Sequence, residues 1–399
     1  MPSSSPEHFL CGPSLAPCGL SRAWAEIDIA ALVDNARVCL EAAGPGGGLM
    51  AILKADAYGH GVGPVARALE SHVRAFGVAG VAEAQELARA LPQGAGGRPA
   101  REILVLGPLY PGEREALVQG GFSASLSQVE EVRALADGVT HGRSPVPVHA
   151  VADTGMGRMG ARGGAFLELV AAIRREPALR LAGVASHFSS ADEDEAATRG
   201  QMRDFENLLL ELRKSGLLTP EVSVHLGNSA GLLRHGRDMP WAPLFRPGLA
   251  LYGVSPLPDS SATLRQVMTV KARVSLVRDL PAGWPVNYGR TFVTPGPMRV
   301  ATLGIGYADG FPRALSGKGA SVLIHGARCP VLGRVTMDQI VVDISHLPGT
   351  IVPGEEAVVC GTQGRETISA SELAQRAGTI AWEILTGISS RVKRVPVFV

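Results

Sequence analysis

A single lysine stands where an apolar run ends and a glycine-rich turn begins. The run 49–53 is apolar and of strand type, Lys54 follows it, and Tyr58, Gly59 and Gly61 come next. A lysine at the mouth of an apolar strand is partly desolvated, which disfavours the ammonium form and lowers its pKa. Because a neutral amine can attack a carbonyl group, Lys54 is suited to forming a Schiff base. The alternative is a lysine whose stem lies on apolar surface while its ammonium reaches water.

Polar residues also follow or adjoin several later β-type runs. The guanidinium of Arg158 stands in a loop with three glycines, which suits it to holding a carboxylate through two hydrogen bonds. A hydroxyl and free backbone N–H groups, as at 229 and 248–249, can bind a phosphate without a lysine. Taken singly, each position is explained as well by an ordinary loop start, a surface turn or the N-cap of a helix. The residues are Asp153, Arg158, His187, Asn228, Ser229, Arg246, Gly248 and Leu249.

Tyrosine is rare, and four of the five tyrosines adjoin a glycine. A tyrosine that acts as acid or base needs its pKa, roughly 10, to be lowered by nearby cations. Tyr–Gly pairs are also common at strand ends for packing reasons, so each pair is weak support when taken alone. The four are Tyr58, Tyr252, Tyr288 and Tyr307.

The elements that must position these side chains alternate between about residues 22 and 256. Short β-rich runs are separated by Ala/Leu/Glu/Arg-rich segments of helical spacing, which favours a (β/α)₈ TIM-type barrel. No Gly-x-Gly-x-x-Gly follows the first strand, so a dinucleotide-binding fold lacks its main support. In such a barrel the strand ends face one site, which would bring the polar residues together. The predicted strands are 48–54, 75–80, 102–107, 122–126, 146–153, 181–187, 223–228 and 248–253, and the clearest predicted helices are 81–91, 128–136, 165–175 and 198–212.

The pattern changes after the Pro/Ser-rich segment 256–261. Runs from 265 to 360 alternate β-branched and polar residues between Gly/Pro turns, which indicates a mainly antiparallel β domain. One amphipathic helix is predicted over 369–377, opened by serines. The fold class is therefore α/β, with a barrel followed by a β domain. The predicted limits are 1–21 for a disordered N-terminal extension, 22–262 for the barrel and 263–399 for the β domain.

Composition excludes several classes of function. The net charge is +1 without a dense Lys/Arg block, so neither nucleic acid nor an anionic membrane is indicated as a partner. No run approaches the length of a membrane span. The five cysteines are scattered without Cys-x-x-Cys or His-rich spacing, which indicates reduced thiols and no metal site. Residues 1–21 lack a basic segment and make a poor signal peptide, so we expect a cytoplasmic protein.

Four segments together resemble the alanine racemases, which are barrel-type enzymes that depend on pyridoxal 5'-phosphate (PLP). The segments are 53–61, 153–158, 304–310 and 333–339, and the resemblance extends from Trp24 to Arg391. It implies interconversion of L- and D-alanine by two bases, supplying D-alanine for peptidoglycan synthesis.

The resemblance also implies a role for each matching residue. Lys54 would form the Schiff base with PLP and act as one catalytic base. Tyr288 would be the second base, on the opposite face of the α-carbon, and would come from the partner subunit of a homodimer with shared active sites. Arg246 would face the pyridine nitrogen, and His187 would link it to the tyrosine. The remaining implied contacts are Tyr58, Asn228, Ser229, Gly248 and Leu249 to the cofactor, and Arg158, Tyr307 and the backbone of Met337 to the substrate carboxylate.

Two positions depart from the family pattern and leave alternatives open. Val151 stands where many members carry a modified lysine that orients the arginine matching Arg158, so a bound anion is one candidate replacement. Trp382 replaces a tyrosine near the phosphate and substrate, so serine or another small amino acid is an alternative substrate. A PLP-dependent decarboxylase would be expected to carry an acidic residue at position 246. A non-catalytic PLP-binding protein would lack the second domain and Tyr288.

Overall fold

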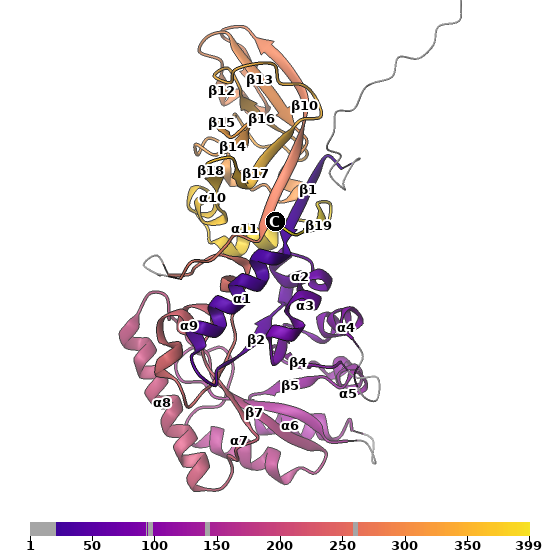
Figure 1. Ribbon diagram of the computed structural model, residues 1–399. Coiled ribbons are helices and arrows are strands. Elements are labelled where there is room, and N and C mark those ends of the chain that lie inside the picture. Colours follow the sequence, from indigo (N-terminus) through magenta and orange to yellow (C-terminus); the bar gives the residue numbers. More distant parts are fainter. Residues whose placement is uncertain (1–20, 93, 95–98, 140–143, 258–261) are drawn as a thin grey trace, which may run out of the picture.

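The computed structural model describes residues 21–92, 94, 99–139, 144–257 and 262–399. The molecule has two stacked lobes, a barrel and a β-rich lobe, joined where helix α1 meets strand β1 (Figure 1). The predicted fold class is confirmed. The predicted N-terminal extension lies outside the described residues, apart from Ser21.

The first lobe is a closed barrel of eight parallel strands. The barrel closes where Gly48 and Leu49 pair with Leu244 and Phe245. Its strands carry mainly buried residues, as expected for a parallel sheet covered by helices. They are β2 (Gly48–Ile52), β3 (Ala75–Val78), β4 (Glu102–Val105), β5 (Ser123–Leu126), β6 (Val146–Val151), β7 (Leu179–Ala185), β8 (Ser223–His225) and β9 (Leu244–Phe245).

The predicted eighth strand, 248–253, is wrong. The closing strand is β9, and residues Leu249–Tyr252 form the 3-10 helix η5, which ends at Gly253 in the left-handed region. All four residues of η5 are buried, and a short buried apolar run cannot be told from a strand by periodicity alone. The correction moves Arg246 from the start of a strand to the end of one, on the same rim as Lys54.

Helices surround the barrel, and the four clearest predicted ones are confirmed. α8 is longer than predicted because the side chain of Asp194 accepts from Ala197 N and begins the helix early. Asn35 on α1 is buried and bonds to the backbone of Leu251 and Arg265, so it ties α1 to the chain leaving the barrel. The barrel helices are α1 (Ile29–Ala43), α3 (Val62–Leu69), α4 (Val81–Ala90), α5 (Arg114–Gly120), α6 (Val129–Ala136), α7 (Gly164–Arg175), α8 (Glu195–Lys214) and α9 (Ser229–His235).

The second lobe is built on a nine-stranded, mainly antiparallel sheet. The strand β1 (Ala23–Asp28) lies in this sheet, between β10 and β19, although it precedes the barrel in sequence. The domain limits 22–262 and 263–399 stay a prediction. Strand β1 falls within the first of these ranges by sequence but pairs in the sheet of the second lobe. The other strands of the sheet are β10 (Met268–Leu280), β13 (Met298–Leu303), β14 (Ser321–Ile324), β15 (Ala327–Leu332), β16 (Ile340–Asp343), β17 (Glu356–Gln363), β18 (Glu366–Ile368) and β19 (Lys393–Val397).

Smaller elements of this lobe include a two-stranded ribbon and two helices. The ribbon pairs β11 (Pro285–Val286) with β12 (Phe292–Val293). The predicted helix 369–377 is confirmed as α10 (Ala370–Ala377), with Ser369 as its N-cap. It is followed by α11 (Ala381–Gly387).

The two lobes meet where α11 lies on α2 (Lys54–Gly59). A Cβ atom on Gly59 would come within 2.3 Å of the carbonyl oxygen of Leu385. Arg394 of β19 donates from Nε to Gly59 O at 2.8 Å and from Nη1 to Val392 O at 2.7 Å. The second lobe is therefore anchored on the turn that carries Lys54.

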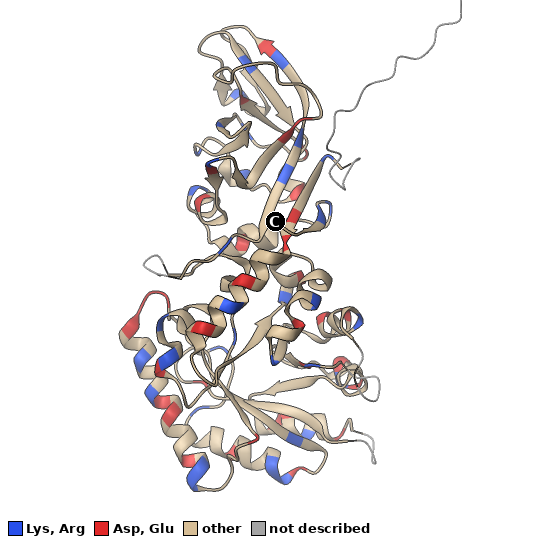
Figure 2. Cartoon of the chain, viewed as in Figure 1, with Lys and Arg blue, Asp and Glu red and all other residues tan. Residues whose placement is uncertain are grey.

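Charges of both signs are mixed over the surface, most clearly along α8 (Figure 2). In the described part of the chain, no helix is long and apolar enough to cross a membrane. The same residues contain no group of three or more His, Cys, Asp or Glu side chains placed to hold a metal ion. Cys39, Cys329 and Cys360 are free and buried.

Candidate active site

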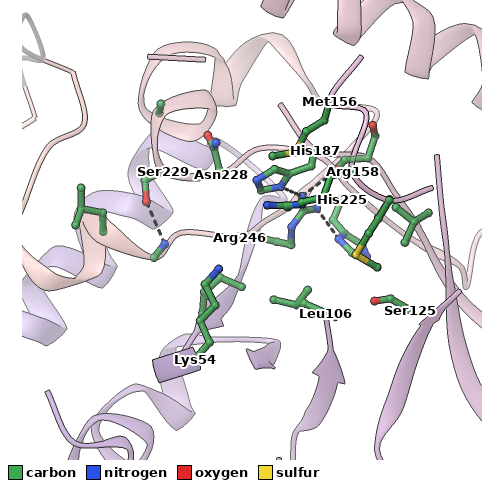
Figure 3. Close-up of a pocket in the computed structure, with 18 of the residues that line it drawn as sticks. Lys54, Leu106, Ser125, Met156, Arg158, His187, His225, Asn228, Ser229 and Arg246 are labelled. Atoms are coloured by element: carbon green, nitrogen blue, oxygen red, sulfur yellow. Dashed lines mark hydrogen bonds between the residues drawn. The ribbon is translucent and has the colours of Figure 1, made fainter. Parts of the chain in front are cut away.

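A cavity of about 270 Å³ lies at the carboxyl ends of the barrel strands. Its walls come from most of the βα loops, and Trp382 of α11 adds a wall from the second lobe. Figure 3 shows Lys54 reaching into the cavity, with Arg246, His187 and His225 grouped across from it. The cavity brings together most of the predicted site residues, whose roles stay predictions: Lys54, Tyr58, Arg158, His187, Asn228, Ser229, Arg246, Gly248 and Leu249.

Lys54 is held by a strained turn. Residues 55–58 all have φ between +52° and +55°, which makes one left-handed turn without a glycine. Such a conformation costs roughly 1–2 kcal/mol per residue, and it persists where surrounding contacts enforce it. Glu83 supplies two of these contacts, accepting from Ala55 N at 2.8 Å and from Ala79 N at 2.7 Å. Asp56 supplies a third by accepting from Val62 N at 2.7 Å.

The surroundings of Lys54 lower its pKa and so increase the fraction of its neutral form. Water reaches its side chain within the cavity, but the cavity walls desolvate the ammonium and lower its pKa. The positive charge of Arg158 lowers this pKa further, and the carboxylate of Glu83 opposes both effects. The predicted lowering of the pKa is confirmed.

Arg246 is buried, and its guanidinium donates only to neutral groups. Nη2 donates to Ser186 O at 2.7 Å, to Leu226 O at 3.1 Å and to His187 Nδ1 at 2.8 Å, while Nη1 donates to His225 Nδ1 at 2.7 Å. Burial, together with the charge of Arg158, lowers its pKa to about 10. The side chain is still a cation at neutral pH.

The bonds from Arg246 identify the tautomers of both histidines. An arginine can only donate, so Nδ1 of His187 and of His225 must accept, and each neutral ring carries its proton on Nε2. Desolvation and then the charge of Arg246 lower the pKa of His187 to about 3 and that of His225 well below its usual range. Both rings are therefore neutral and oriented.

A cradle of backbone N–H groups lies beside Tyr58. Ser229 Oγ accepts from Gly248 N at 3.0 Å and from Ala250 N at 3.2 Å. A Cβ atom at position 248 would come within 2.4 Å of the hydroxyl oxygen of Tyr58, so glycine is required there. Burial raises the pKa of Tyr58 to about 12, which keeps its hydroxyl protonated and able to donate. Because Ser229 Oγ occupies the N–H groups of Gly248 and Ala250, the hydroxyls of Ser229 and Tyr58 are the donors that suit a phosphate.

Asn228 serves this wall differently from the other members. Its side chain accepts from Gly231 N at 2.9 Å and is the N-cap of α9. The contact seen for this side chain is therefore the helix cap that the sequence offered as the alternative to a cofactor contact. It still lines the cavity.

The loop of Arg158 is ordered by Asp153, whose carboxylate accepts from the N–H groups of residues 155–157 at 2.9–3.1 Å. Burial acts to raise the pKa of Asp153, but these bonds outweigh it and the pKa is lowered. Among the described residues, no side chain or backbone group hydrogen-bonds the Arg158 guanidinium, and Val151 lines the cavity with carbon only. The guanidinium is thus free to bind an anion.

Three predicted residues lie outside the cavity. Tyr288, Tyr307 and Met337 belong to the second lobe, and their side chains are 73%, 41% and 52% exposed. Ala308 N donates to Met337 O at 3.0 Å, and Asn287 Nδ2 donates to Arg334 O at 2.9 Å, so their loops pack together. One chain does not bring these side chains to Lys54.

Sequence reasoning missed His225, which orients Arg246, and the residues behind it. His225 and His149 each stand within an apolar predicted strand, 223–228 and 146–153. A lone histidine inside such a strand must find a buried partner, which is the signal that could have identified both.

Comparison of the sequence with known protein families gives a match to each of the two lobes. The family described as alanine racemase, N-terminal domain, matches residues 27–256, and the one described as alanine racemase, C-terminal domain, matches residues 267–396. An alanine racemase of Methylacidiphilum infernorum is 39% identical over 94% of this chain and 92% of its own length.

Solved structures agree with the sequence matches. The alanine racemase of Bacillus anthracis, with bound L-Ala-P, superposes with a TM-score of 0.84 at 34% identity, covering 94% of this chain and 95% of that one. The alanine racemase of Bartonella henselae, with covalently bound pyridoxal phosphate, gives a TM-score of 0.82 at 29% identity and covers 94% of this chain and 100% of that one.

Proposed function

The chain belongs to the alanine racemase family, and we propose that its cavity racemises alanine with Lys54 as one base and Tyr288 of a second copy as the other. The enzyme depends on PLP and interconverts L- and D-alanine. The observation that carries the site assignment is Lys54, which among the described residues is the one lysine lining the cavity, with a lowered pKa and facing a buried Arg246. We also propose that the D-alanine formed supplies peptidoglycan synthesis.

The donor set of the cavity fits PLP. The hydroxyls of Ser229 and Tyr58 would hold its phosphate. Ser229 Oγ accepts from Gly248 N and Ala250 N and keeps its own O–H to donate, and a Cβ atom at position 248 would collide with the Tyr58 hydroxyl. Lys54 would hold its aldehyde carbon. When bound, PLP withdraws electrons from the α-carbon of the amino acid and so acidifies the α-proton.

Arg246 limits what the site can do with that acidity. Its guanidinium stays charged and cannot pass a proton to an acceptor, so a ring nitrogen that faced it would stay unprotonated. Side reactions such as transamination are thereby limited. An acidic residue, which a decarboxylase would be expected to carry here, is absent from position 246.

Neither Tyr58 nor His187, which line the cavity in one chain, is suited to act as the second base. Tyr58, the one tyrosine among the described residues that line the cavity, has a pKa raised to about 12, so at neutral pH its hydroxyl is protonated and cannot take up a proton as a base. His187 has its Nδ1 occupied by Arg246, and its Nε2–H can only donate. A phenolate oxygen would accept from that N–H, which suits an exposed tyrosine such as Tyr288 arriving from a second copy.

Two further features of the assembly and its location belong to this proposal. We propose a homodimer in which the exposed Tyr288, Tyr307 and Met337 of each copy cover the cavity of the other.

We also propose a cytoplasmic location, supported by three free, buried cysteines.

Borohydride reduction followed by peptide mapping tests the lysine. We expect the reduced cofactor on Lys54, and K54A should not be labelled. Label on any other lysine in the native enzyme would overturn the assignment.

Subunit mixing tests the shared site. K54A and Y288F homodimers should each be inactive, while co-expression gives mixed dimers with one intact site. Because about half of the dimers are mixed and each has one of two sites, we expect about a quarter of wild-type activity. Activity no higher than that of the separate variants would place both bases in one chain.

Trp382 favours a second candidate substrate, because its indole lines the cavity from α11. Racemisation of serine or another small amino acid is the alternative. Chiral analysis of a panel of amino acids incubated with the enzyme distinguishes the candidates, and carbon dioxide release would instead indicate decarboxylation. An enzyme that changes none of them would be a PLP-binding protein only.

A further inference from the structure

A line of buried hydrogen bonds runs from Arg246 through the barrel interior to its opposite end. His225 Nε2 and His149 Nδ1 are 2.7 Å apart, and His149 Nε2 lies 2.9 Å from Glu102 Oε1. Both imidazoles are buried, with 1% and 0% exposure. Ser123 Oγ donates to the same carboxylate oxygen at 2.6 Å.

The line has only one consistent direction. Arg246 donates to His225 Nδ1, so His225 must donate from Nε2 to His149 Nδ1. His149 then carries its proton on Nε2 and donates to Glu102. Reversing any one bond would leave two donors or two acceptors facing each other.

The surrounding backbone makes room for this line. A Cβ atom on Gly183 of β7 would come within 2.3 Å of His149 Nδ1, so only glycine admits the ring at that place. The two imidazoles meet edge to face, with ring centroids 5.0 Å apart.

Glu102 is the one anion on the line. It stands at the first residue of β4, and its side chain lines a cleft at the amino end of the barrel together with Glu221. Burial acts to raise its pKa, but the bonds from His149 and Ser123 and the charge of Arg180 outweigh it and hold the pKa at about 2. Arg246, at the other end, has no carboxylate among its own hydrogen-bond partners.

We propose that Glu102 is a positioning residue for Arg246, acting through His149 and His225. By accepting from His149 Nε2, it favours the same His225 tautomer that the bond from Arg246 requires, and so strengthens that bond. It also supplies the remote negative charge that the buried cation lacks locally. This inference deepens the proposed function and rests on it for the contact between Arg246 and the cofactor.

Two variants of Glu102 separate charge from hydrogen bonding. E102Q keeps an oxygen that accepts from His149 but removes the charge. E102L removes both. E221Q is the matched control, because Glu221 lines the same cleft and bonds to Thr219 instead of a histidine.

The first readout is the ring nitrogen spectrum of ¹⁵N-histidine-labelled holoenzyme, with His225 assigned by substitution. We expect the Nε2–H tautomer for His225 in the wild type, E102Q and E221Q. In E102L we expect a mixture, because without the acceptor at position 102 part of the population adopts the other tautomer and loses the bond from Arg246 to His225 Nδ1. The signal is independent of racemisation, so failure of the proposed function and failure of the relay are distinguishable.

The second readout is the dissociation constant for PLP, measured with the kinetics. We expect binding roughly tenfold weaker in E102L, the size of effect seen when an orienting partner of a ligand is lost, and a smaller loss in E102Q. The value of kcat should fall while KM for alanine changes little, since Arg158 is untouched. If E102L fails to fold, E102Q decides through its PLP affinity. In E102L, a His225 tautomer and a PLP affinity equal to those of E221Q would overturn the proposal. In E102Q, a PLP affinity equal to that of E221Q would overturn it.

Discussion

Three cations share the cavity, and each changes the protonation of its neighbours. Arg158 lowers the pKa of both Lys54 and Arg246, and all three charges lower the pKa of His187. A cavity with this potential attracts the phosphate of the cofactor and the carboxylate of the amino acid. The same charges favour the neutral amine that attacks the aldehyde. Anion binding and amine activation therefore depend on the same residues.

Removing the charge of Arg158 should raise the pKa of Lys54, because that charge is one of the causes of its lowering. In R158M, a smaller fraction of Lys54 is neutral at pH 7, so its reaction with an amine reagent in cofactor-free enzyme should slow several-fold. The pH dependence of that rate gives the shift. A midpoint that moves to lower pH would contradict the assignment of Arg158 as a cause.

Glu83 provides the opposite change at the same lysine. Its carboxylate raises the pKa of Lys54, so E83Q should lower it and speed the reaction at a given pH. The amide of E83Q also places an NH₂ group near Ala55 N and Ala79 N, which weakens the support of the left-handed turn. Thermal unfolding should therefore show a lower Tm for E83Q, and R158M is the comparison that changes charge without touching this turn.

At the scale of elements, the contact between α2 and α11 holds both the lysine turn and one cavity wall. Gly59 has φ +78° and lies against Leu385, while Trp382 on the same helix α11 faces the cavity. A displacement of α11 would therefore change the cavity as well as the lobe junction.

G59A should be destabilising for two reasons that a control separates. The left-handed conformation costs an alanine about 1 kcal/mol, and the clash with Leu385 O adds about 1–3 kcal/mol. Gly216 has φ +70° with no atom near its absent Cβ, so G216A bears the first cost alone. Chemical unfolding should show G59A less stable than G216A; equal losses would mean that the junction yields without cost.

The loops of Tyr307 and Met337 depend on a cluster of ion pairs. Asp309 is buried and accepts from Arg22 Nη2 at 2.7 Å and from Gly306 N at 2.9 Å. Arg391 joins it to Asp338, beside Met337, at 2.6 Å. The N-terminal strand region thereby reaches the loops that we propose face the partner's cavity.

D309N should weaken this cluster and disturb the proposed substrate contacts. Loss of charged hydrogen bonds costs about 1.5–3 kcal/mol, and KM for alanine should rise more than kcat falls. D279N, at an exposed position of β10, should change neither stability nor KM. A wild-type KM in D309N would show that the cluster serves stability only.

Sequence patterns predicted elements best where local signals were strong. Periodicity identified the barrel helices, serines marked the start of the helix predicted over 369–377, and the barrel and β domain followed from the change in pattern after residue 256. The eighth strand failed because η5 is as apolar and buried as a strand. The line from Arg246 to Glu102 could not be derived, since it joins β4, β6 and β8 across the barrel interior. The strained turn after Lys54 also lacks a local signal, because its residues 55–58 include no glycine.

At the scale of the whole molecule, the chain begins and ends its described course in the second sheet. β1 lies between β10 and β19, so the barrel is inserted between strands of that sheet. The barrel rim holds the cavity, while the second lobe exposes Tyr288, Tyr307 and Met337 away from the cavity of its own chain. We propose that one chain thus carries two halves of a site that it does not join.

Dilution should separate these two halves. A monomer keeps the cavity, Lys54 and the phosphate cradle, so the absorption of bound PLP should persist below the dissociation constant of the dimer. Racemase activity per chain should fall over the same range, because Tyr288 of the second copy is lost, and sedimentation velocity gives the dimer fraction to compare with it. Y288F serves as the control, since its activity is already lost and its spectrum should not change on dilution. Full activity in samples that sediment as monomers would show that one chain completes its own site.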